Sequence, residues 1–285
     1  MQATNDVDVL SGWIGRSTSS TDALTPRQAH WLALTLDLEG AQIEFAAGDR
    51  MPPLWHFTCF VDAARRSELG EDGHPRRGDF LPPIALPRRM WAGGSFTFHG
   101  DLHIGEPIER TSTITDVRAR SGKSGPLIFV TIGHEYAVDG ELRLSERKEL
   151  VYRDNMGDTA PRPQPPSAPD GQVWTSTIEP DPVLLFRYSA LTFNNHRIHY
   201  DRDYTTKVEH YPGLLVHGPL TATLLAAFAE SWTGQHLQTF DYRGSAPLFD
   251  AEPFTLSGSP TETGADVWAQ TPSGGLAMTA TATFR

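Results

Sequence analysis

The order of secondary-structure signals constrains the fold of this chain most, because the same order occurs twice. In residues 1–156, helical segments come first and runs with β-branched or aromatic residues at alternating positions follow. Residues 172–285 have one short strand, then helical segments, then strand-like runs to the C-terminus. Between the two copies, residues 157–171 contain five prolines and are typical of an extended linker.

The predicted helices have recognisable ends. In the first copy, Thr25 can cap a helix whose first position is Pro26, and a second helix is predicted over residues 55–70. In the second copy, helices are predicted over residues 182–192 and 219–232. The sequence therefore predicts an α+β fold of two antiparallel sheets, each wrapped around a central helix.

A short internal repeat supports the duplication. An aromatic-x-aromatic-x-Gly pattern followed by a Glu-Pro pair occurs in residues 96–107 and again, with two extra residues, in residues 240–253. The three parts are thus predicted as an N-terminal unit, a proline-rich linker and a C-terminal unit.

Composition excludes several classes of function. The 24 basic and 35 acidic residues give a net charge of −11, which argues against nucleic-acid binding. The single cysteine, Cys59, excludes an internal disulfide and a cysteine-based metal cluster. No stretch approaches the roughly 20 apolar residues of a membrane helix, and no signal peptide precedes the first helix. We expect a cytoplasmic protein that does not bind membranes.

The most informative segment is L-F-R-Y-S-A-L-T-F-N-N-H-R-I-H-Y-D, residues 185–201. It resembles the active-site segment of MaoC-like enoyl-thioester hydratases and dehydratases, whose motif is an aromatic residue, then Ser/Thr-Gly-Asp-x-Asn-Pro-aliphatic-His. This alignment puts His199 at the catalytic His and Asn194 at the catalytic Asp. His196 takes the place of the motif's Asn, and Arg197 that of its Pro.

Other segments resemble one branch of that family, the double-hotdog dehydratases of the mitochondrial type and the mesaconyl-C4-CoA or itaconyl-CoA hydratases. These segments are L-P-R-R-M-W-A-G-G (residues 86–94), S-G-K-S-G-P-L-I-F-V-T-I (residues 121–132) and P-G-L-L-V-H-G-P-L-T-A-T-L-L (residues 212–225). The resemblance implies a double hotdog with a non-catalytic N-terminal unit and a catalytic C-terminal unit. It also implies a hydro-lyase, an acyl-CoA substrate, no cofactor, since CoA is part of the substrate, and a homodimer.

The chemistry of hydration suits these residues. Adding water to a double bond conjugated with a thioester needs a proton acceptor, a proton for the α-carbon and a donor to the thioester oxygen. His199 is the expected acid/base, because an unperturbed imidazole has a pKa of ~6.5. Asn194 can hold the water but cannot take its proton. The N–H of Gly218, before Pro219 at the start of a helix, is the expected oxyanion donor.

Several neighbouring residues have two possible roles. His196 can bind substrate or make a structural hydrogen bond, and His217 can line the site or pack beneath it. Tyr188, with Ser189, can shape the pocket or be simply packed. The spacing His196-x-x-His199 lacks the third ligand of a zinc site, so no metal is predicted.

Basic residues upstream are candidates for binding anions. Arg88 and Arg89 can bind a substrate carboxylate or the phosphates of CoA, or form a solvated pair. Lys123 in S-G-K-S-G can contact a CoA phosphate or belong to an ordinary turn. The full spacing of a nucleotide phosphate loop is absent around it.

We favour a short branched dicarboxyl substrate, such as itaconyl-CoA or mesaconyl-C4-CoA. A 3-hydroxyacyl-ACP dehydratase is the first alternative, although it needs a basic face for its acidic carrier. A hotdog thioesterase is the second, but residues 219–229 contain no acid and Glu230 comes late for that role. An acyl-thioester-binding protein without catalysis is the third.

Overall fold

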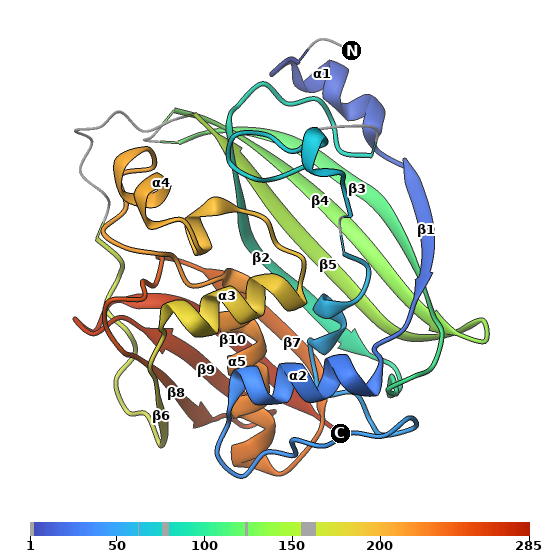
Figure 1. Ribbon diagram of the computed structural model, residues 1–285, viewed down its shortest axis with the longest axis vertical. Coiled ribbons are helices and arrows are strands. Elements are labelled where there is room, and N and C mark those ends of the chain that lie inside the picture. The colour runs from blue at the N-terminus through green and yellow to red at the C-terminus, as the bar shows by residue number, and fades with distance from the viewer. Residues whose placement is uncertain (1–2, 62, 76–79, 123–124, 155–163) are drawn as a thin grey trace.

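One continuous antiparallel sheet of ten strands dominates the computed structural model, which describes residues 3–61, 63–75, 80–122, 125–154 and 164–285 (Figure 1). The strand order is β1-β3-β4-β5-β2-β7-β10-β9-β8-β6. The strands are β1 (Ser17–Asp22), β2 (Arg88–Phe98), β3 (Ile108–Gly122), β4 (Gly125–Val138), β5 (Glu141–Arg153), β6 (Trp174–Ile178), β7 (Leu237–Gly244), β8 (Phe254–Pro260), β9 (Ala265–Gln270) and β10 (Leu276–Phe284).

The two halves of the chain meet at the centre of this sheet, where β2 pairs with β7. Phe96 lies opposite Phe240, and Gly94 lies opposite Tyr242. The two copies of the aromatic repeat therefore begin on neighbouring strands. The predicted double hotdog is confirmed, with its two half-sheets joined into one.

Helices cover the sheet chiefly in the second half (Figure 1). α5 packs against β7, β8, β9 and β10, and α2 lies beside α3. The helices are α1 (Val7–Leu10), α2 (Pro26–Leu36), α3 (Pro182–Leu191), α4 (Arg202–Lys207) and α5 (Gly218–Thr233), with short 3₁₀ turns η1 (Ser11–Trp13), η2 (Trp55–Thr58), η3 (Arg66–Glu68) and η4 (Arg197–His199).

Local signals placed three helices correctly. Thr25 caps α2 through a hydrogen bond from the N–H of Gln28, as its position before Pro26 predicts. α3 and α5 begin and end within one or two residues of their predicted bounds. α5 ends at Gly234, whose φ of 66° is the left-handed conformation favoured for glycine after a helix.

The helix predicted over residues 55–70 is wrong, because this segment forms the two short turns η2 and η3. Leu54 and Phe60, on either side of η2, have positive φ angles of 67° and 54° that end helical structure. Both side chains are buried in the core, and the N–H of Phe60 donates to Asp22 Oδ2 at 2.8 Å. Packing and this hydrogen bond therefore override the local helical preference.

The larger hydrophobic core spans both halves, since Phe96 and Tyr136 of the first belong to the same buried cluster as Leu220 of the second. A smaller core lies in the first half, where Leu10 and Trp13 pack with residues of β3, β4 and β5. Residues 157–163 of the predicted linker lie outside the described residues. The boundaries at residues 1–156, 157–171 and 172–285 stay predictions, as do the homodimer and the cytoplasmic location.

None of the helices formed by the described residues combines the length and apolar composition that a membrane crossing requires.

Candidate active site

The segment that carries the motif leaves α3 through a tight turn. Phe193 has a positive φ of 49°, and the N–H of Asn194 donates to Ser189 O at 2.8 Å. The side-chain Oδ1 of Asn194 then accepts a hydrogen bond from the N–H of His196 at 3.0 Å. These contacts fix the path of the histidine segment (residues 194–199), which ends in η4.

His199 is buried in a defined orientation. Its Nδ1 lies 2.8 Å from the carbonyl oxygen of Leu215, which can only accept a hydrogen bond, so Nδ1 carries the proton of the neutral ring. Nε2 is then left as the acceptor. Burial lowers the pKa of His199 to about 4, although the bond to Leu215 favours the charged form. The ring is therefore neutral at pH 7 and can accept a proton.

His217 stacks directly on His199. The ring centroids are 3.7 Å apart, and the planes are inclined by 20°. His217 is fully buried, its Nε2 lies 2.8 Å from Ser189 Oγ, and its Nδ1 has no hydrogen-bond partner among the described residues. Burial, together with the charges of His199 and His196, holds its pKa well below the usual value. His217 thus packs against the catalytic candidate as a neutral ring.

Gly218 follows His217 as the first residue of α5, where backbone N–H groups have no partner within the helix. A Cβ atom at this position would lie 2.8 Å from Cε3 of Trp91, so any side chain would collide with the indole. Trp91 comes from β2 in the first half, and its Nε1 is buried without a partner among the described residues. Glycine is required here by the close approach of Trp91.

A loop of the first half, residues 70–75, docks on the histidine segment, a contact that the sequence-based expectations did not include. The N–H of Arg197 donates to the carbonyl of Asp72 at 2.9 Å. Gly73 has a φ of 89°, and a Cβ atom there would lie 1.9 Å from Asn195 O. Only glycine meets both conditions, and this requirement in D-G-H was the signal available in the sequence.

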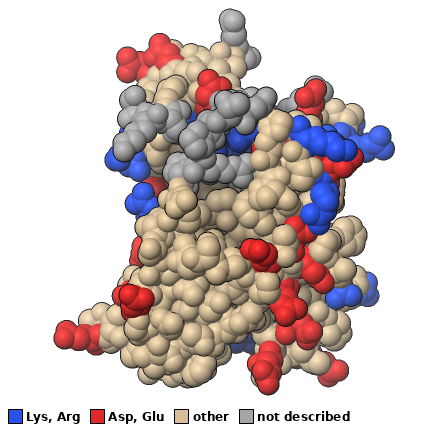
Figure 2. Space-filling model, turned by 90° about the vertical axis from the view of Figure 1, so that its left-hand side faces the viewer, with Lys and Arg blue, Asp and Glu red and all other residues tan. Residues whose placement is uncertain are grey.

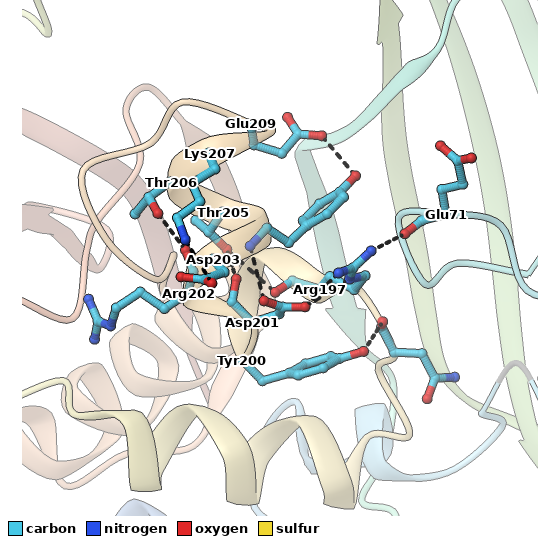
Figure 3. A network of polar contacts seen from close by, with 12 residues as sticks. Glu71, Arg197, Tyr200, Asp201, Arg202, Asp203, Thr205, Thr206, Lys207 and Glu209 are labelled. Atoms are coloured by element: carbon cyan, nitrogen blue, oxygen red, sulfur yellow. Dashed lines mark hydrogen bonds and ion pairs between the residues drawn. The ribbon is translucent and has the colours of Figure 1, made fainter.

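Arg197 ties the same loop to α4, as Figure 3 shows. Its guanidinium forms a 2.7 Å ion pair with Asp201 and donates to the carbonyl of Glu71 at 3.1 Å. The cation also lies over the ring of Tyr204, 4.2 Å from the centroid. Arg197, at the position of the motif's proline, therefore holds the two halves together through these contacts.

The docked loop brings a carboxylate and an imidazole close to His196. The Nδ1 of His74 lies 3.0 Å from Asp72 Oδ2, and the backbone N–H of His74 donates to Asp72 Oδ1 at 3.0 Å. The His74 and His196 rings are 4.1 Å apart, and the His196 and His199 rings are 5.5 Å apart. The four side chains form a continuous row from Asp72 to His199.

Asp72, His74 and His196 also have the donor types of a divalent-metal site, with ligand atoms within 4.8 Å of one another. Both carboxylate oxygens of Asp72 accept hydrogen bonds from His74 in this arrangement. The motif spacing alone had missed this third group.

The two candidate arginines have different surroundings. Arg88 forms a 2.8 Å ion pair with Glu209, just beyond α4. The charge of Arg89 lies near His196, where it acts with burial and other nearby charges to lower the pKa of that ring. Of the two arginines, Arg89 is therefore the one whose charge acts on His196.

Tyr188 and Lys123 are the remaining candidates. Tyr188 is buried with its ring 5.0 Å from that of His217, and burial raises the pKa of its hydroxyl. It packs beneath the site. Lys123 lies outside the described residues.

Comparison with known proteins agrees with this architecture. Residues 54–250 match the family model of the hydroxyacyl-thioester dehydratases type 2. The chain is 45% identical to the mesaconyl-C(4)-CoA hydratase of Chloroflexus aurantiacus, over 94% of this chain and 95% of that protein. It is 29% identical to the mitochondrial hydroxyacyl-thioester dehydratase type 2 of Schizosaccharomyces pombe, over 74% of this chain and 78% of that protein.

Solved structures share the fold. HtdX of Mycobacterium tuberculosis superposes with a TM-score of 0.68 at 15% identity, over 95% of this chain and 100% of HtdX. A MaoC-like dehydratase gives a TM-score of 0.70 at 16% identity, over 96% of this chain and 99% of that one. With a family match over more than half its length and a relative aligned almost end to end, the chain belongs to the hydroxyacyl-thioester dehydratase type 2 family and is a hydro-lyase.

Proposed function

We propose that this enzyme reversibly hydrates an enoyl-CoA thioester, with His199 as the acid/base. The observation that carries the proposal is the 2.8 Å contact between His199 Nδ1 and the Leu215 carbonyl, which leaves Nε2 as a buried proton acceptor. The lowered pKa keeps this acceptor unprotonated at neutral pH. The substrate we favour is a short branched dicarboxyl acyl-CoA, since a 45% identical relative is named a mesaconyl-C(4)-CoA hydratase.

In the hydration direction, the water oxygen forms a bond to the β-carbon and one water proton passes to Nε2 of His199. The electrons of the double bond move toward the thioester oxygen, and the α-carbon takes a proton from His199. The net change is the addition of one water molecule. Dehydration runs through the same groups in reverse.

Asn194 orients the water in this proposal. One lone pair of its Oδ1 accepts from the N–H of His196, so a second lone pair and the amide N–H groups are left for water. An amide cannot take a proton at neutral pH, so His199 is the titrating group.

The N–H of Gly218 is the proposed donor to the thioester oxygen. It belongs to the first turn of a 16-residue helix, where the partial positive charge of the helix favours an oxyanion. The flat Trp91 ring against Gly218 limits the space for the acyl group on that side.

Charges near the site suit an anionic substrate. Arg88 is already paired with Glu209, so Arg89 is the better candidate for the free carboxylate of a dicarboxyl acyl group. Figure 2 shows one face of the molecule, on which Lys and Arg side chains gather mainly in the upper part, at the height of α4 in Figure 1. The reaction needs no further cofactor.

The test is a panel of enoyl-CoAs, with and without a second carboxylate, in which loss of the conjugated-thioester absorbance is followed. We expect hydration, fastest with a branched dicarboxyl substrate. Release of free thiol would instead indicate a thioesterase, and binding without turnover would indicate an acyl-thioester-binding protein. Activity confined to ACP-linked substrates would favour the fatty-acid dehydratase.

A further inference from the structure

The histidine segment carries no carboxylate next to its acid/base. Asn194 is an amide. The nearby acids of the second half form ion pairs with arginines: Asp201 with Arg197, and Glu209 with Arg88. A buried imidazole that gains a proton during a reaction is stabilised by a fixed negative charge nearby. Any such charge has to come from elsewhere in the molecule.

The first half supplies one. Asp72 holds His74 through both of its oxygens, each at 3.0 Å. Burial raises the pKa of Asp72, but the hydrogen bonds and charge of His74 outweigh it, so the carboxyl is ionised at neutral pH. His74 in turn lies against His196, with 4.1 Å between ring centroids, and the edge-to-face contact of His196 with His199 completes the row.

The position of this carboxylate is fixed by the docking of its loop. The carbonyl of Asp72 accepts from Arg197 at 2.9 Å, and Gly73 sits against Asn195 too closely for any other residue. Arg197 reaches the neighbouring carbonyl of Glu71 as well (Figure 3). Asp72 therefore moves together with the histidine segment and keeps its distance from it.

We propose that Asp72 and His74 are positioning residues, supplied by the non-catalytic half, which act through His196 on His199. Resting on the proposed hydratase function, this inference assigns the row of side chains a role in turnover. Asp72 orients His74, His74 sets the ring of His196, and the negative charge of Asp72 partly offsets the positive charge that appears on His199. The opposing charges around the row are Arg89 from β2 and, when protonated, His74 itself, whereas His217 before α5 stays neutral.

The test replaces Asp72→Asn, which keeps the shape of the side chain and removes its charge, and separately His74→Gln. For Asp72→Asn we expect kcat to fall by about 10-fold or more while KM changes by less than about threefold, since the loss falls on the transition state. The acid limb of kcat should also move to lower pH, because a less stabilised imidazolium is a stronger acid. His74→Gln should lower kcat in the same way.

The matched control is Asp203→Asn, the same substitution on α4, where the carboxylate is exposed and pairs with Lys207. We expect wild-type kcat, KM and pH profile from it. If Asp72→Asn and His74→Gln fold, as judged by circular dichroism, and keep the wild-type kcat and pH profile, the inference is overturned. It is equally overturned if kcat falls only in step with the folded fraction and the pH profile does not move.

His199→Ala separates this inference from the function on which it rests. An inactive His199→Ala variant beside a fully active Asp72→Asn variant would overturn the positioning role alone. An active His199→Ala variant would overturn the hydratase mechanism itself.

Discussion

Each half of the molecule buries a pair of histidines, but their partners differ. In the first half, the carboxylate of Glu146 accepts a 2.6 Å hydrogen bond from the Tyr136 hydroxyl and lies 3.7 Å from His56 Nε2. His134, in register with Glu146 across β4 and β5, bonds through Nδ1 to Ser112 Oγ at 2.7 Å. We call these five residues the first-half network.

In the second half, His199 and His217 stack on each other, and their hydrogen-bond partners among the described residues are a carbonyl and a hydroxyl. Burial raises the pKa of Glu146, but the charges of His134 and His56 lower it by more, so this carboxylate is ionised and accepts the hydrogen bond from Tyr136. A carboxylate buried among donors fixes structure, whereas a buried imidazole held by one carbonyl keeps an acceptor for chemistry. The group that a buried histidine contacts, and not burial alone, therefore decides its role.

The largest effect that can test this contrast is on stability. Glu146→Ala leaves the Tyr136 hydroxyl without its acceptor and His56 without its ion-pair partner. Removing one member of a buried charged group costs about 3–5 kcal/mol. Denaturant unfolding should show this loss, while turnover per folded molecule stays near wild type. A fall in turnover at unchanged stability would place the first-half network in the active site and contradict its structural role.

His199→Ala should give the largest effect on catalysis. Loss of the acid/base should reduce kcat by ~100-fold or more, with the fold intact. The matched control is His134→Ala, a buried histidine of the first-half network, which should lose stability and keep its turnover. Near-normal hydration by His199→Ala would remove the proposed mechanism.

Asn194→Ala should have a smaller effect, because it removes a group that holds water without transferring a proton. We expect kcat to fall by about 10-fold, the scale of one lost hydrogen bond of about 1.4 kcal/mol. Asn195→Ala is the neighbouring control, since the Asn195 contacts described above use its backbone oxygen. Equal rates for the two variants would mean that water is held elsewhere.

The smallest expected effect is on the pH dependence of catalysis. The sequence suggested an acid limb near the ordinary histidine pKa of ~6.5, but burial lowers the pKa of His199 to about 4. The value of kcat/KM should therefore be independent of pH near neutrality and fall only as the pH approaches 4. A limb centred at pH 6–7 would contradict a buried His199 as the base.

The same shift affects stability, with a definite sign. A histidine whose pKa is lowered by folding binds its proton more readily in the unfolded chain, so the free energy of unfolding falls as pH drops from ~6.5 toward the folded value. The pH profile therefore has to be measured by brief exposure to acid, with unfolding followed in parallel by fluorescence.

How much the sequence could predict depended on how local each signal was. Thr25 with Pro26, and Gly218 with Pro219, placed α2 and α5 because caps and first-turn prolines act within a few residues. The resemblance to the family motif identified the histidine segment, and that motif too spans only neighbouring residues. The helix over residues 55–70 was predicted wrongly, since the burial of Leu54 and Phe60 depends on contacts distant in the sequence.

The sequence by itself determined the duplicated α+β order, the helix ends and the identity of the histidine that the family motif selects, because these follow from neighbouring residues. Tertiary structure alone decided that β2 and β7 join the halves, that His217 stacks on His199, and that Asp72 lies in the same row of side chains. These contacts join residues far apart in the chain, and no local periodicity encodes which of them will meet. The Leu215 carbonyl that holds His199 comes from the same half, whereas His74, whose charge also lowers the pKa of His199, comes close only when the two halves pack together.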